Sequence, residues 1–276
     1  MANKYILSIF LFFIVFSVKA QKDLFVKAEN EIVRLSEIVY SAETDKEKID
    51  ANEKLIDELY NIISHKKSMR YGFEQLEHIS VLEPEDKSIR IFTWAMHYKS
   101  DLFQYFGMVQ YYDKKQRAQV VHVLRDESLR IKNEESKILT PDYWYGALYY
   151  DIITTEHEGR TYYSLLGWDG HTAKSDKKII DVLWFNNAKQ LKFGAPLFVS
   201  DQGIQNRYIL EYNELASVVL EYKPKDKIIL FDQLEPVDGE SHEVKTSYVP
   251  TLNYNGFIFK KGKWNLLKRL EPTELK

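Results

Sequence analysis

Three acidic residues stand inside apolar stretches, where a charged side chain is unusual. Asp151 interrupts the run L-Y-Y-D-I-I, Asp181 interrupts I-I-D-V-L, and Glu211 separates Leu210 from Tyr212. An inward carboxylate is costly unless it is paired. Glycoside hydrolysis needs two carboxyl groups facing each other across a cleft, roughly 5–10 Å apart. The sequence does not show that separation, and a salt bridge or a solvent-facing edge is the simpler explanation.

Asp169-Gly170-His171 follows Trp168 directly, at the end of an aromatic stretch. Loop tips often carry functional residues. An Asp-Gly pair is also a standard turn, so we predict a turn here, with Trp168 capping the core. The weak catalytic candidates are therefore Asp151, Asp169, His171 and Asp181.

Other kinds of chemistry find little support. The seven histidines show no metal-ligand spacing, and there is no serine-nucleophile, P-loop or dinucleotide motif. With no cysteine, disulfides, thiolate metal sites and cysteine nucleophiles are excluded. We expect no cofactor and no metal. The five tryptophans could offer stacking faces for sugars, but they lie in expected strands, where aromatic residues commonly fill a core.

The amino terminus predicts export. Lys4 precedes an apolar run from Ile6 to Val18, and Val18-Lys19-Ala20 places small residues at the positions that a signal peptidase reads. The run is shorter than the roughly 18–20 residues of a membrane span. We expect cleavage after Ala20, a soluble mature chain without a transmembrane segment, and a periplasmic or secreted location. A net charge of −3 argues against a nucleic-acid partner.

Helices are expected only near the start of the mature chain. Apolar residues between 23 and 42 recur every three or four positions, as on one face of an amphipathic helix. The sequence Thr44-Asp45-Lys46-Glu47 matches a capping box, which predicts a second helix and an antiparallel hairpin. Spacing of apolar residues from Tyr71 to Ile79 fits a short third helix.

Strands are expected from Ser88 onward, with the hairpin of residues 143–171 in the middle of the sheet system. Two aromatic and β-branched runs flank a polar turn that ends in Gly159. The remaining strands are expected at 88–97, 102–112, 117–125, 177–185, 190–198, 206–212, 216–222, 227–233, 256–260 and 264–267. Residues 126–142 and 236–250 are expected to be loops.

Helices followed by many strands indicate an α+β fold. We expect an N-terminal helical hairpin followed by a mainly antiparallel β sandwich or partial barrel. The expected parts are a signal peptide (1–20), a helical hairpin region (21–82) and an antiparallel β domain (83–276).

Several strand sequences, taken in order, resemble those of a family. They are I-R-I-F-T-W at 89–94, Y-F-G at 105–107, L-L-G-W-D-G at 165–170, F-G-A-P-L-F at 193–198 and G-K-W at 262–264. Together they resemble uncharacterised exported β-rich proteins of Bacteroidota-type bacteria. The resemblance implies export and a β-rich body, but no activity and no catalytic residues.

The most consistent interpretation is an exported, non-enzymatic binding or envelope-assembly protein, whose partner is an envelope protein or a glycan. One alternative is an envelope glycan hydrolase that uses a pair of strand carboxylates. The other is a small-molecule carrier with an apolar cavity inside a partial barrel. The sequence leaves the ligand, the partner and the oligomeric state open.

Overall fold

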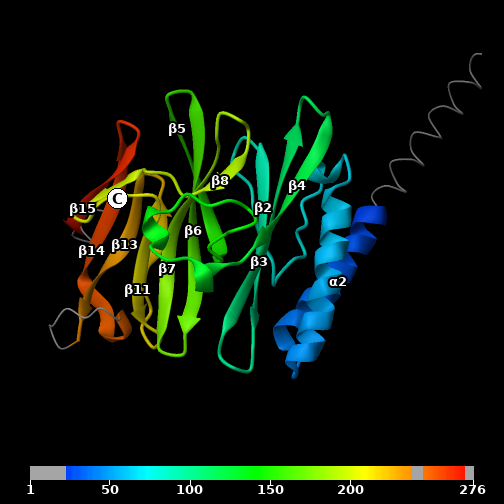
Figure 1. Ribbon diagram of the computed structural model, residues 1–276, viewed down its shortest axis with the longest axis horizontal. Coiled ribbons are helices and arrows are strands. Elements are labelled where there is room, and N and C mark those ends of the chain that lie inside the picture. The colour runs from blue at the N-terminus through cyan, green and yellow to red at the C-terminus, as the bar shows by residue number, and fades with distance from the viewer. Residues whose placement is uncertain (1–22, 238–244, 271–276) are drawn as a thin grey trace, which may run out of the picture. The chain divides into compact units, whose positions relative to one another are not determined.

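The computed structural model describes residues 23–237 and 245–270 (Figure 1). The chain divides into two compact units. The first comprises Met1–Ile79 with Gln110–Val121, and the second comprises Ser80–Val109 with His122–Lys276. The expected signal peptide lies outside the described residues. No helix within the described part of the chain is long and apolar enough to cross a membrane.

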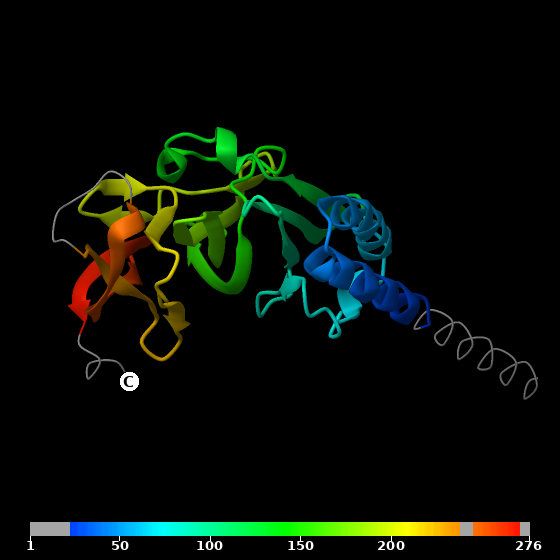
Figure 2. The same ribbon diagram turned by 90° about the horizontal axis from the view of Figure 1, so that it is seen from below.

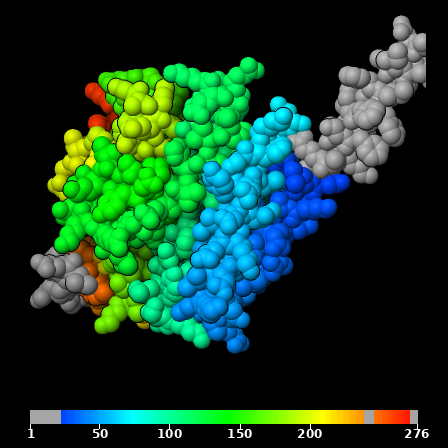
Figure 3. Space-filling model, turned by 45° about the vertical axis from the view of Figure 1, so that its right-hand side comes forward, coloured from blue at the N-terminus to red at the C-terminus, as the bar shows by residue number. Residues whose placement is uncertain are grey.

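The first unit is built around two helices, residues 23–41 and α2 (Asp45–Ile63), which lie side by side in Figure 3. The predicted capping box is formed: the backbone N–H of Glu47 donates to Thr44 Oγ1 at 3.2 Å, and that hydroxyl donates to Glu47 Oε2 at 2.6 Å. The helices bury the apolar faces that the spacing indicated, including Ile32, Leu35 and Leu55. The helical hairpin is therefore confirmed.

The expected third helix is not formed. Only a short 3₁₀ turn, η1 (Ser68–Arg70), follows α2, and Phe73 has a φ of 54°, which no α-helix contains. The buried carboxylate of Glu29 organises this segment instead. It accepts hydrogen bonds from the Tyr71 hydroxyl and, at 2.9 Å, from the backbone N–H of Gln75. A long-range contact thus replaces the helical hydrogen bonds that the local pattern suggested.

Three sheets follow the helices. The four-stranded sheet has the order β1-β2-β3-β4, and part of β3 and β4 is counted with the first unit. Its strands are β1 (Ser80–Leu82), β2 (Ile89–His97), β3 (Phe103–Asp113) and β4 (Ala118–Arg125).

The five-stranded sheet has the order β11-β7-β6-β5, with β8 paired to β7. Its strands are β5 (Leu148–His157), β6 (Arg160–Thr172), β7 (Ser175–Phe185), β8 (Leu191–Phe193) and β11 (Tyr208–Asn213). The six-stranded sheet has the order β10-β9-β15-β14-β13-β12. Its strands are β9 (Phe198–Ser200), β10 (Gly203–Gln205), β12 (Leu220–Lys223), β13 (Ile228–Pro236), β14 (Tyr248–Lys260) and β15 (Lys263–Leu270).

The last two sheets share one hydrophobic core. Figure 2 shows their strands from a second side. Leu166 of β6 and Ile180 of β7 lie in the same cluster as Phe231 of β13 and Phe257 of β14. All described strand pairs of these two sheets are antiparallel except β9 with β15. The fold is an α+β arrangement with a mainly antiparallel sandwich, as expected.

The long hairpin is formed by β5 and β6, with its turn at Glu158-Gly159. The expected central position holds for β6, which lies inside the strand order, but not for β5, which ends it. A register shift between Tyr149 and Asp151 interrupts the regular alternation of β5, because a bulge changes the face to which later residues point.

Two other local expectations are corrected. The strand expected at 190–198 is divided into β8 and β9, because the chain turns at Gly194, whose φ is +80°. Asp169 and Gly170 do not form a turn, since both lie within β6. The chain reverses instead between Thr172 and Ser175, whose backbones pair.

The loop from 126 to 142 contains two short 3₁₀ turns, η2 (Ser128–Arg130) and η3 (Glu134–Ser136). Leu139 pairs with Phe193 in an isolated bridge, which fixes this loop against β8. In the other expected loop, at 236–250, the last three residues already belong to β14. Residues 238–244 lie outside the described part.

Candidate functional site

The candidate carboxylates do not share one cleft. Asp151 pairs with Leu166 of β6, whereas Asp181 pairs with the adjacent residue Leu165. Successive residues of a strand point to opposite faces of a sheet. Asp151 therefore lies on the face of the sheet opposite to that of Asp181.

Asp169 and Asp181 share a face but are far apart along it. Asp169 pairs with Lys177, which precedes Asp181 by four positions on β7. At about 3.3 Å per residue this is roughly 13 Å, more than the roughly 5–10 Å between the carboxyl groups of glycoside hydrolases. The structure thus brings no two of these three carboxylates together as a hydrolytic pair.

Asp181 has a structural role. It is fully buried and lies 2.9 Å from Nη2 of Arg207, which is also fully buried. Its other oxygen accepts a hydrogen bond from the Tyr149 hydroxyl at 3.0 Å, and that hydroxyl accepts one from Trp144 Nε1 at 3.0 Å. Arg207 Nη1 donates at 2.6 Å to the carbonyl oxygen of Glu134. This ion pair connects β7 to the segment after β10 and to the covering loop.

Asp169 and His171 lie close together near the end of β6. The Asp169 carboxyl is 3.9 Å from Nδ1 of His171, and its residue is only 5% exposed. Burial raises the pKa of Asp169 to about 7, although the positive charge of Lys177 acts in the opposite direction. Burial also lowers the pKa of His171, so its neutral form is favoured.

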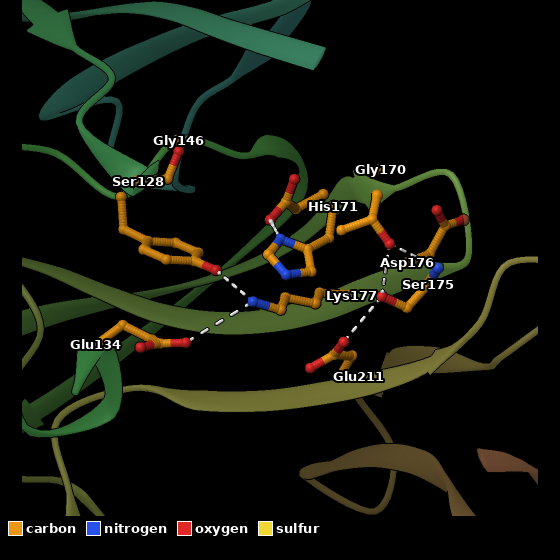
Figure 4. A network of polar contacts seen from close by, with 12 residues as sticks. Ser128, Glu134, Gly146, Gly170, His171, Ser175, Asp176, Lys177 and Glu211 are labelled. Atoms are coloured by element: carbon orange, nitrogen blue, oxygen red, sulfur yellow. Dashed lines mark hydrogen bonds and ion pairs between the residues drawn. The ribbon is translucent and has the colours of Figure 1, made fainter. Parts of the chain in front are cut away.

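Lys177 of β7 is the centre of the polar network in Figure 4. In the sheet register it is directly opposite Asp169 on one side and Glu211 of β11 on the other. The residue is 5% exposed. Its ammonium donates to the Tyr145 hydroxyl at 3.1 Å and lies 3.7 Å from Glu134 Oε1.

This ammonium retains hydrogen-bonding capacity. A lysine has three N–H donors. Among the described residues, only the Tyr145 oxygen is within hydrogen-bond distance of Nζ, because 3.7 Å to Glu134 is an ion-pair separation. A buried charge is stable only when its surroundings compensate for lost water. Two N–H donors of Lys177 can therefore accommodate a further oxygen acceptor.

Lys177 lines a pocket of about 380 Å³ beside β11, within the second unit. The charged lining residues are Glu134, Glu135, Lys177, Glu211, Asp232 and Lys245. Tyr208 and Tyr248 add aromatic surface, and Asn255 adds an amide. The mixture of ionic, amide and aromatic groups is suited to a small polar molecule.

The carboxylates of this pocket are held by the protein but keep acceptor capacity. Glu211 Oε1 accepts from the Ser175 hydroxyl at 2.8 Å, and Glu135 Oε1 accepts from the Ile209 N–H at 3.1 Å. Burial raises the pKa of Glu135 and that of Asp232. The described residues contain no cluster of histidine and carboxylate side chains that could hold a metal ion.

The sequence singled out Asp169, His171 and Glu211 but not Lys177. The missing information was the tight turn at Thr172–Ser175, which sets Lys177 opposite Asp169. No family model, curated protein or solved structure matches this chain. The function is therefore inferred from the chain's own residues.

Proposed function

We propose that this chain is an exported, non-enzymatic binding protein that holds a small polar ligand in the pocket beside β11. The observation that carries the proposal is Lys177, a buried ammonium with unused donors at the wall of that pocket. Such a group costs free energy in an empty protein and is satisfied when a ligand supplies an acceptor.

Export rests on the amino-terminal sequence, with its basic start, apolar run and small residues before position 21. The resemblance to exported β-rich proteins of Bacteroidota-type bacteria supports the same location, periplasmic or secreted. A chain without cysteine depends there on its core alone, and the sandwich supplies a large one.

Binding is favoured over hydrolysis by the separation of the strand carboxylates. Asp151 lies on the other face, and Asp181 is occupied by Arg207. The pocket is polar rather than apolar, which favours a hydrophilic ligand over the apolar cargo of a barrel-type carrier. An envelope glycan fragment or another hydrophilic envelope compound fits this chemistry.

A ligand panel followed by thermal unfolding tests the proposal. The protein purified after export would be mixed with oligosaccharides, peptidoglycan fragments, amino acids and divalent cations. A ligand at about one hundred times its Kd stabilises the folded state by roughly 2.7 kcal/mol. We expect at least one hydrophilic class of ligand to raise the unfolding temperature, and we expect Lys177→Met to abolish this increase.

Lys174→Met is the matched control, because Lys174 is an exposed residue at the turn before β7. It removes the same charge three residues away without touching the pocket. A shift that survives Lys177→Met unchanged, or a panel in which no ligand raises the unfolding temperature, would overturn the proposed site.

A further inference from the structure

Resting on the proposed binding function, we infer that the pocket beside β11 selects a small primary ammonium compound that also carries an oxygen acceptor. Amino sugars and amino acids share this chemistry. The ammonium would lie beside the carboxylate of Glu211, which is directly opposite Lys177 in the sheet register. The oxygen acceptor would receive hydrogen bonds from Lys177.

The charge of the lining favours a cation. Four carboxylates and two lysines line the pocket. Of these lysines, Lys177 is already 3.7 Å from Glu134, and the Lys245 ammonium lies 3.9 Å from the ring centroid of Tyr248. Because the negative charges outnumber the positive ones, a ligand that brings a positive charge is attracted and an anion without one is repelled.

The carboxylates also need donors. An ionised carboxylate accepts hydrogen bonds at about four lone-pair positions. Glu211 gives one oxygen to Ser175, and Asp232 gives one to the Val219 N–H at 2.7 Å. An ammonium group of a ligand can donate to the acceptor positions that remain on such a carboxylate.

Lys177 is the reason to expect an oxygen acceptor on the same ligand. It is almost completely buried, it lines the same pocket, and the described residues occupy only one of its three donors at hydrogen-bond distance. A simple amine would satisfy the carboxylates but leave these donors unused. A hydroxyl or carboxylate oxygen on the same ligand satisfies both ends of the site, which explains why the pocket contains opposite charges.

The size of the pocket limits the ligand. About 380 Å³ lies near the lower end of the roughly 300–1,000 Å³ range of small-molecule sites. One sugar ring or one amino acid is therefore the expected occupant. Tyr208 and Tyr248 offer aromatic faces to the apolar side of such a molecule.

Isothermal titration calorimetry with the protein purified after export tests this inference. The probes are glucosamine and glucose, which differ by the amine, and lysine with glycine, which separate an amino-acid source from a sugar source. We expect at least one amine probe to bind and glucose to bind at least tenfold more weakly than glucosamine. Ethylamine, which has no oxygen acceptor, should also bind at least tenfold more weakly than the best amine probe.

Two variants test the site from different elements. Glu211→Gln in β11 removes a proposed ligand contact, and Glu134→Gln in η3 removes the charge that lies 3.7 Å from the Lys177 ammonium. Each should weaken binding of the best amine probe at least tenfold. Glu214→Gln is the control, because Glu214 is exposed at the turn after β11. The unfolding temperature of each variant shows that it is folded before its affinity is compared.

The outcomes separate the ligand class from the site. If glucose binds as well as glucosamine and Lys177→Met abolishes both, the ammonium class is wrong while the pocket function stands. If an amine binds equally well to wild type, Glu211→Gln and Lys177→Met, both the class and the site are wrong. Failure of every amine probe also overturns the inferred class.

Discussion

Replacing Asp169 by asparagine should change how protein stability depends on pH. An unfolded aspartate titrates with a pKa of about 3.9. In the folded protein burial raises the pKa of Asp169 to about 7, opposed by the charge of Lys177. Between these two values the folded state keeps a proton that the unfolded state has lost. The unfolding free energy contributed by this group therefore falls as the pH rises from about 4 to about 7.

The magnitude follows from linkage. Each unit of pKa difference corresponds to about 1.4 kcal/mol, so wild-type stability should fall by about 2 kcal/mol between pH 5 and pH 7 through Asp169 alone. Asparagine has a similar shape and does not titrate. Asp169→Asn should therefore gain about 2 kcal/mol relative to wild type over this interval, even if its absolute stability is lower at both pH values.

Denaturant unfolding at pH 5, 6 and 7 measures this difference, with the midpoint and slope determined for each protein. Asp57→Asn is the control, because Asp57 is exposed on α2 and should follow the wild-type profile. Parallel profiles for wild type and Asp169→Asn would refute the reasoning, since they would mean that Asp169 titrates alike in the folded and unfolded states.

Three further predictions test other parts of the structure. Arg207→Met should destabilise the protein by roughly 3–5 kcal/mol, because it leaves the buried Asp181 carboxylate unpaired, and Arg207→Met with Asp181→Leu should recover much of this loss in denaturant titrations. Glu29→Ala should lower the free energy of unfolding by roughly 1–3 kcal/mol for each buried group that it leaves unpaired. It should also speed amide hydrogen exchange at Gln75, whose N–H loses its acceptor. Sequencing of the exported protein should begin at residue 21, whereas an intact Met1 would contradict cleavage.

Local signals were sufficient where a single turn or cap determines the structure. The capping box at Thr44 predicted the start of α2 because its donors and acceptors lie within four residues of one another. The turn at Gly159 could likewise be predicted, since Gly159 has a φ of +70° that glycine adopts readily. The order of helices and strands then indicated the α+β fold class.

Prediction failed where a distant partner decides the conformation. Apolar spacing after Ser68 suggested a helix, but Glu29, more than forty residues earlier, satisfies the donors of that segment. The end of β6 is another case. The register of β6 and β7 shifts between Asp169 and Thr172, and this bulge depends on the pairing with β7 and not on the Asp-Gly sequence. The location of Lys177 followed from that pairing, so the centre of the candidate site could not be predicted.

The two faces of β7 explain how the sandwich can hold such a site. Ile180 and Val182 point into the apolar core between the two sheets. The alternate residues include Lys177 and Asp181, which lie on the opposite face. There Lys177 contacts Glu134 and Tyr145 directly. Asp181 is connected to Glu134 through Arg207. Asp181 is ion-paired with Arg207 and accepts a hydrogen bond from Tyr149, whereas Lys177 keeps donor capacity at a pocket wall. The same strand therefore carries one ionic group that stabilises the fold and another to which we assign ligand binding.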